Sequence, residues 1–153
     1  MSLLKIVLGE DTKILRTVCD PVEKFDASLK KLVLNMDETM NKAKGVGIAA
    51  PQVGVNQRVF LAMLGSESKN PVTVAMVNPE ITYFSEEEEK GEEGCLSLPE
   101  KFGKVWRSKQ VVVKYQDIKA KIHQLKLSGL DARVVQHELD HLNGVLFLDR
   151  LEH

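Results

Sequence analysis

The chain has 153 residues, with 21 basic against 22 acidic side chains, and we expect one domain over residues 1–153. A hydrophobic fraction of 43% and a charged fraction of 28% exclude a disordered chain, a fibre and a coiled coil. The net charge of −1 argues against direct nucleic-acid binding, and no apolar run approaches the roughly 20 residues of a membrane-spanning helix.

Residues 1–10 lack the features of a signal peptide and are expected to form a short strand. The two cysteines, Cys19 and Cys95, are too few for a disulfide scaffold, which favours a reducing compartment. We interpret Cys19 as a small core residue.

An amphipathic helix is predicted over residues 26–44, capped by Asp26 or Ser28 and ended by Gly45. Residues 45–54 follow and are rich in glycine and alanine, so another backbone can approach them closely. We interpret them as an extended rim to which a peptide adds as a strand, with Gln52 as a neutral amide donor. The alternative is a plain tight turn, whereas a phosphate loop is excluded because no Gly-Lys-Ser/Thr follows.

Strands are predicted in the middle of the chain from β-branched and apolar runs. They cover residues 58–64, 72–77, 81–84, 105–107, 110–116 and 122–127, with a last strand at 145–148. The acidic run 85–90 is expected to be a solvated turn or strand edge.

A second helix is predicted over residues 128–142, with Ser128 as its cap, Asp131 completing a near capping box, and Asn143-Gly144 ending it. One helix before the strands and one after them predict an α+β fold. In that fold, mixed or antiparallel sheets pack around the second helix.

The second helix carries the pattern HELDH at residues 137–141. Residues four apart share one helix face, so the imidazoles of His137 and His141 can bind one metal ion. Glu138 is turned by about 100° from His137 and can reach a water at that metal as a general base. The alternative of two ordinary helix histidines is weaker, because the stripe they continue is apolar and unpaired imidazoles are costly there.

A catalytic metal site needs a third protein ligand besides two histidines. Phe147 stands where a downstream histidine would complete a known zinc-protease pattern, so the third ligand must lie upstream. Cys95 is the best candidate, because coordination deprotonates a thiol; a small core residue is the alternative. We interpret His123 as an ordinary polar residue.

Three segments, in this order, resemble the motifs of the peptide deformylase family: GxGLAAxQ, EGCLS and QHExDHL. They read GVGIAAPQ at residues 45–52, EGCLS at 93–97 and QHELDHL at 136–142. The chain departs from the family pattern at Ile48, where leucine is usual. It departs again at Arg133, where we expect an apolar residue beside the substrate side-chain pocket.

The resemblance implies a metal-dependent hydrolase that removes the N-formyl group from formyl-methionine at the N-terminus of nascent polypeptides and releases formate. It implies Cys95, His137 and His141 as ligands of one divalent metal ion. The physiological ion would be Fe²⁺, with Zn²⁺, Ni²⁺ or Co²⁺ in preparations, and the ligand chemistry suits zinc and ferrous iron alike.

In this resemblance Glu138 is the general base, and the side-chain amide of Gln52 and the backbone N–H of Leu96 stabilise the oxyanion. The substrate lies extended along residues 45–48. Residues expected to bind it are Gly45, Val46, Gly47, Ile48, Leu130 and Val134. We also predict that Glu93 pairs with Arg107 and holds the cysteine loop.

Three other interpretations stay open: a zinc peptidase, a structural zinc module and an inactive family member. The expected partners are formylmethionyl nascent peptides and, through a local charged patch, the ribosome near its exit tunnel. We expect a monomer in a bacterial cytoplasm, with an organelle as the alternative, and neither a membrane nor a nucleic acid as partner.

Overall fold

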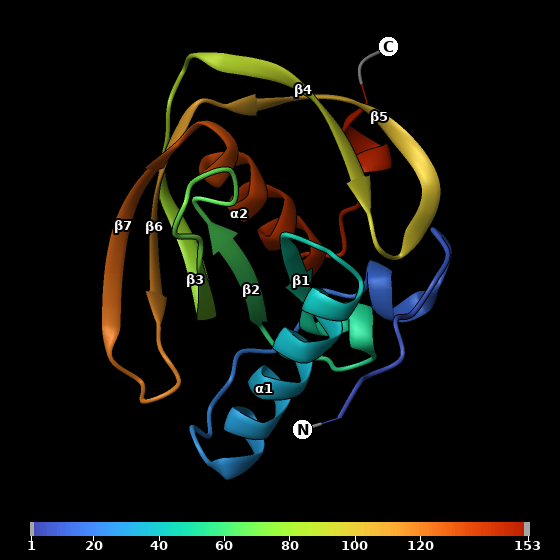
Figure 1. The fold of residues 1–153 in the computed structure, drawn as a ribbon, viewed down its shortest axis with the longest axis vertical. Coiled ribbons are helices and arrows are strands. Elements are labelled where there is room, and N and C mark those ends of the chain that lie inside the picture. Colours follow the sequence, from blue (N-terminus) through green and yellow to red (C-terminus); the bar gives the residue numbers. More distant parts are fainter. Residues whose placement is uncertain (1, 152–153) are drawn as a thin grey trace.

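The computed structural model describes residues 2–151 and has an α+β fold with antiparallel strand pairing throughout (Figure 1). The helices are α1 (Ala27–Lys42) and α2 (Gly129–Leu142). The strands are β1 (Gly47–Ala49), β2 (Val59–Leu64), β3 (Val72–Phe84), β4 (Glu88–Cys95), β5 (Leu98–Ser108), β6 (Gln110–Gln116) and β7 (Ile122–Ser128). Short 3-10 turns are η1 (Lys13–Arg16), η2 (Ala50–Val53) and η3 (Phe147–Arg150). The predicted fold class is confirmed.

The two helices cover opposite faces of a five-stranded sheet of order β1-β2-β3-β6-β7. Side chains alternate between the faces of a strand. On β2, Phe60 and Ala62 therefore pack with α2, whereas Val59 and Leu61 pack with α1. The β4–β5 hairpin forms a second sheet that arches over α2 (Figure 1). Helix α2 thus lies between two sheets.

Helix α1 begins as predicted, because the carboxylate of Asp26 accepts the backbone N–H groups of Ser28 and Leu29. It ends just before Gly45, whose N–H bonds to the carbonyl of Met40. Within residues 2–151, neither α1 nor α2 combines the length and apolar character needed to cross a bilayer.

Two predictions about the strands were wrong. Residues 72–84 form one strand rather than two, because Asn78 adopts a left-handed φ of 49° inside an irregular stretch instead of ending the strand. Its side chain bonds both to the backbone of Val22 and to Gln116, which stabilises this bend. Strand β4 was missed, and β5 is much longer than the predicted 105–107, because their charged and glycine-rich sequences carry little strand propensity.

The chain ends were also predicted wrongly in part. Residues 2–9 form no strand: Val7 and Gly9 make isolated backbone bonds to Gln52 and Ser97. Met1 lies outside the described residues. The predicted strand at 145–148 gives way to η3, because the Asp149 carboxylate accepts the N–H of Leu146.

The start of α2 also differs from the prediction. Ser128 occupies the cap position without a side-chain hydrogen bond, and Asp131 instead accepts the N–H of Gly65. The predicted end of α2 is confirmed at Gly144. A side chain there would collide with the backbone of Arg16, and φ is 73°, so only glycine fits.

Candidate metal centre

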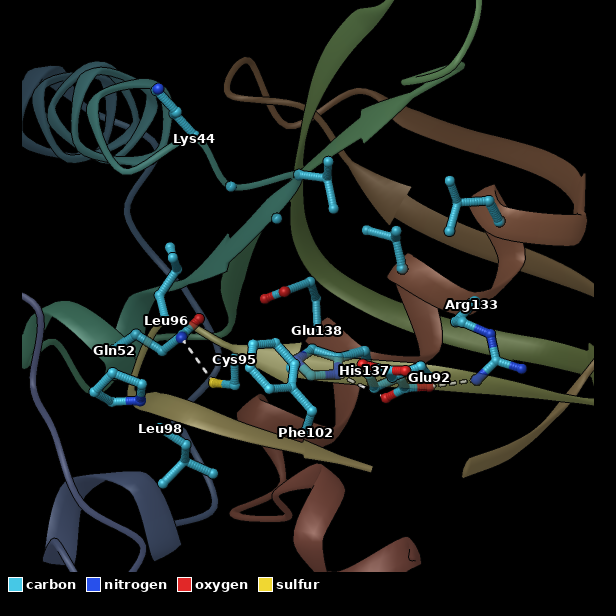
Figure 2. Close-up of a pocket in the computed structure, with 18 of the residues that line it drawn as sticks. Lys44, Gln52, Glu92, Cys95, Leu96, Leu98, Phe102, Arg133, His137 and Glu138 are labelled. Atoms are coloured by element: carbon cyan, nitrogen blue, oxygen red, sulfur yellow. Dashed lines mark hydrogen bonds and ion pairs between the residues drawn. The ribbon is translucent and has the colours of Figure 1, made fainter. Parts of the chain in front are cut away.

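Three predicted metal ligands meet where the two sheets flank α2, and Figure 2 shows two of them, Cys95 and His137. His137 and His141 come from successive turns of α2, and Cys95 is the last residue of β4. Their ligand atoms lie within 4.8 Å of one another. The Nε2 atom of His141 is 3.3 Å from Nε2 of His137 and 3.4 Å from Sγ of Cys95.

The two spacings from Nε2 of His141 fit a tetrahedral metal ion. With metal–nitrogen bonds of about 2.0–2.1 Å and a metal–sulfur bond of about 2.3 Å, ligand atoms lie about 3.3–3.6 Å apart. Two facing nitrogens and a thiol sulfur at such distances form a donor set for a borderline divalent cation. The residues present therefore fit the metal that the sequence predicts.

The position of His137 is fixed by Glu93. Glu93 Oε1 lies 2.9 Å from Nδ1 of His137. Both carboxylate oxygens of Glu93 also accept hydrogen bonds from the Arg107 guanidinium, Oε1 at 2.8 Å and Oε2 at 2.9 Å. Burial opposes ionisation of Glu93, but the hydrogen bonds from Arg107 and His137 hold its pKa well below the ordinary range. The predicted pairing of Glu93 with Arg107 is confirmed.

The two histidines have opposite electrostatic surroundings. Burial disfavours the charged form of His137, but hydrogen bonds with Cys95 and Glu93 outweigh it and raise its pKa to about 10. Burial and the neighbouring His137 charge hold the pKa of His141 well below its ordinary value. The pair therefore favours one positive charge at this point, which a metal cation would supply as well as a proton.

Glu138 lies beside the ligand cluster and is buried. Burial raises its pKa to about 7, and its Oε2 has no hydrogen-bond partner among the described residues. A buried carboxylate with a free oxygen and a pKa near neutrality suits a general base. Its side chain packs against Gly47 so tightly that an added Cβ would lie 2.6 Å from Oε1.

The amide of Gln52 is oriented toward the cysteine ligand. Its Oε1 accepts the N–H of Ala49 at 2.9 Å, so its Nε2 faces Cys95 Sγ at 3.4 Å and Ser97 Oγ at 3.2 Å. Leu96 follows Cys95 in the turn between β4 and β5, which puts its backbone N–H next to the same sulfur-bearing residue. The amide of Gln52 thus lies at the cluster, and Leu96 lines the neighbouring cavity, while the role of its N–H stays a prediction.

A cavity of about 470 Å³ opens beside the cluster and is mostly apolar. The predicted substrate residues that line it are Gly45, Val46, Gly47, Leu130 and Val134. Ile48 does not line it: its side chain is fully buried in the core beneath α1, so only its backbone could meet a substrate. The departure from the family motif at Ile48, where leucine is usual, therefore lies in the core and not in the cavity wall.

Strand β1 has an open edge toward this cavity. It is the terminal strand of the five-stranded sheet. The carbonyl of Val46 accepts the N–H of Met63 on β2 at 2.8 Å. Backbone groups alternate in direction along an antiparallel strand, so the N–H and C=O of Gly47 face the open edge. An extended peptide could pair there, as the sequence predicted.

Several residues at the site were not predicted. Asp140 receives both Arg107 and Arg150, which extends the ion network behind the metal ligands. Phe102 lies 66% exposed at the cavity mouth and packs on Gly94. Asp140 stands within the HELDH pattern, but a single sequence gives no signal that pairs it with Arg150.

His123 and Cys19 take no part in the site. His123 is exposed, pairs with Asp117 at 2.8 Å and stacks on Tyr115. Cys19 is buried in the core, where burial raises the pKa of its thiol. Both therefore have the ordinary structural roles predicted for them.

Comparison with known proteins extends the match beyond the site. The family model described as polypeptide deformylase matches residues 3–153. The peptide deformylase of Thermotoga neapolitana is 49% identical over 139 residues, which cover 91% of this chain and 82% of the relative. The crystal structure of the Thermotoga maritima peptide deformylase is 46% identical, with a TM-score of 0.92 and 99% of both chains covered. An actinonin-bound class I type b peptide deformylase from Acinetobacter baumannii is 40% identical, with a TM-score of 0.90, covering 99% of this chain and 100% of that one.

Proposed function

The chain belongs to the peptide deformylase family and removes the N-formyl group from nascent peptides, and from this premise we propose the roles of its site residues. Cys95, His137 and His141 hold one divalent metal ion. The observation that carries this assignment is the approach of their three ligand atoms beside a buried, unpartnered carboxylate oxygen of Glu138. When bound, the metal supplies a Lewis acid that polarises the formyl group and lowers the pKa of water.

Glu138 acts as the general base and then the general acid. It takes a proton from the attacking water and gives it to the nitrogen of the leaving amine, so formate and a free N-terminus result. Its burial keeps the carboxylate poorly solvated and its proton affinity high, which supports transfer in both directions.

The oxyanion that develops on the formyl oxygen is stabilised by two donors, the Nε2 amide of Gln52 and the backbone N–H of Leu96. The Gln52 amide is held in advance, because Ala49 fixes its Oε1. A donor fixed before the reaction pays no reorganisation cost in the transition state.

The substrate lies extended along residues 45–48 and pairs with the outward backbone groups of Gly47. Its methionine side chain enters the cavity between Val46, Leu130 and Val134. Apolar walls and a neutral rim suit a substrate that is recognised by its backbone and by one apolar side chain.

The physiological metal is proposed to be Fe²⁺, with Zn²⁺, Ni²⁺ and Co²⁺ as substitutes. The mixed thiolate and imidazole set accepts each of these ions. A bacterial cytoplasm is the proposed compartment, because a thiolate ligand needs reducing surroundings. An organelle is the alternative, and we further propose a monomer that meets its substrate as the peptide leaves the ribosome.

The test is formate release from a formyl-methionyl peptide by anaerobically purified protein, with the metal content measured. Formate must appear with the metal-loaded protein and disappear with Cys95→Ala, which lacks a ligand. A zinc peptidase would instead cleave an internal peptide bond, and the thiolate ligand disfavours that reaction. Products of internal cleavage, or no formate from the metal-loaded protein, would contradict the proposal.

A further inference from the structure

Arg133 connects α2 to both strands of the hairpin that carries Cys95. It lies on α2 one turn before His137, and its side chain is only 13% exposed. Its guanidinium donates to the carbonyls of Glu89 on β4, at 2.6 Å, and of Val105 on β5, at 3.1 Å. The charged end is therefore held by the hairpin, although Arg133 also lines the cavity (Figure 2).

The same guanidinium donates to Oε2 of Glu93 at 2.6 Å. A carboxylate has about four lone-pair sites, and those of Glu93 are all used. Oε2 accepts hydrogen bonds from Arg107 and Arg133. Oε1 accepts one from Arg107 and lies 2.9 Å from Nδ1 of His137. Glu93 is 4% exposed, so bulk water could not replace a donor that is removed.

This arrangement determines the orientation of one metal ligand. As a metal ligand His137 is neutral, and donation from its Nδ1 to Glu93 then places the only proton on Nδ1 and leaves the lone pair of Nε2 for the metal. The Nδ1 atom of His141, by contrast, has no hydrogen-bond partner among residues 2–151. The imidazole geometry of the centre therefore depends on Glu93, and on the groups that fix Glu93.

A glycine makes room for this contact. Gly91 lies on β4 so close to Arg133 that an added Cβ would lie 2.9 Å from the guanidinium carbon. An alanine at this position would therefore displace the guanidinium without changing its charge.

We propose that Arg133 is a positioning residue for the metal ligand His137, acting through Glu93, and that it also holds the cysteine-bearing hairpin at its distance from α2. This proposal rests on the metal site of the proposed function. Loss of a partner behind a metal ligand typically lowers metal affinity about 10- to 100-fold. We expect the rate of metal release to rise by a similar factor when the guanidinium of Arg133 is removed or displaced.

The experiment compares the Co²⁺-loaded wild type with three variants: Arg133→Met, Arg133→Lys and Gly91→Ala. The methionine keeps an unbranched apolar stem but has no charge. Release of Co²⁺ to a chelator is followed by the loss of the thiolate–cobalt absorption band. We expect release about 10- to 100-fold faster in Arg133→Met and Gly91→Ala. Arg133→Lys should be intermediate, because an ammonium cannot reproduce the planar fork.

Arg16→Met is the matched control. Arg16 also joins separate segments, by donating to Asp149 and to the carbonyl of Glu10, but it does not touch Glu93. If Arg133 were merely structural, both methionine variants would lower the melting temperature and leave the cobalt band and its release rate unchanged. That result would overturn the inference, as would wild-type release in Gly91→Ala. A wild type that binds no Co²⁺ would instead refute the metal site itself.

Discussion

Replacing Gly47 with alanine should displace the Glu138 carboxylate and slow catalysis without removing the metal. The added Cβ would lie 2.6 Å from Oε1 and 2.9 Å from Cδ and Cγ of Glu138. Ordinary contact begins near 3.4 Å, so the carboxyl group must move by about 0.8 Å. Glu138 is buried from solvent but lines the cavity, so its carboxyl group can move there, away from the position that it holds beside the metal ligands.

The size of the effect follows from this displacement. Misplacing a catalytic group by about 1 Å can cost about 100-fold in rate. We therefore expect kcat to fall about 100-fold in the metal-loaded variant. Crowding a packed site by one methyl group also destabilises the fold by about 1–3 kcal/mol, which leaves the protein foldable.

The assay is formate release at saturating substrate, with kcat and KM determined separately and the metal content of each sample measured. Gly103→Ala is the control, because its Cβ would crowd the end of the Leu151 side chain, and neither residue lines the cavity. That side chain can turn aside, so kcat should change much less. A metal-loaded Gly47→Ala enzyme with wild-type kcat would refute the assignment of Glu138 as a precisely placed base.

Other substitutions test the remaining roles. Glu138→Gln should lower kcat about 10²- to 10⁴-fold at unchanged metal content; equal activity would exclude it as the base. Gln52→Leu removes one oxyanion donor and should cost about 10²- to 10³-fold in kcat, measured with the metal-loaded protein. Arg107→Ala leaves two buried carboxylates without their cationic partner. It should lower the free energy of unfolding by about 3–5 kcal/mol and the metal affinity about 10- to 100-fold. Unchanged metal occupancy in a chelator titration would contradict this. Asp26→Ala should lower the midpoint of a denaturant titration and leave kcat unchanged, because Asp26 only caps α1.

The residues that meet at the site were predictable because their chemistry constrains them. His137 and His141 share a helix face by spacing alone, and two histidines demand a further ligand. Cys95 lies 42 positions before His137 in the sequence. Its position beside them therefore depends on how the β4–β5 hairpin folds over α2. The order of the three family motifs predicts that Cys95 reaches the histidines, whereas the periodicity of apolar residues does not.

The errors have local physical causes. Asn78-Pro79 has the composition of a turn, but hydrogen bonds of the Asn78 side chain let the strand continue through it. Residues 145–148 are apolar enough for a strand, but the Asp149 carboxylate accepts the N–H of Leu146 and a 3-10 turn begins at Phe147 instead. Arg133 looked out of place beside an apolar pocket because the sequence does not reveal that Glu93 lies within its reach. In each case a long-range or side-chain contact overrides the local preference.

The open edge of β1 bears on the solubility of the folded protein. Exposed strand edges are templates for pairing between copies of a chain, and long ones invite aggregation. Here the strand has only three residues, and Gln52 already accepts the N–H of Ala49. The outward backbone groups of Gly47 are therefore too few to align a long strand from a second copy of this chain. The edge can receive a short chain terminus without becoming a site of self-association.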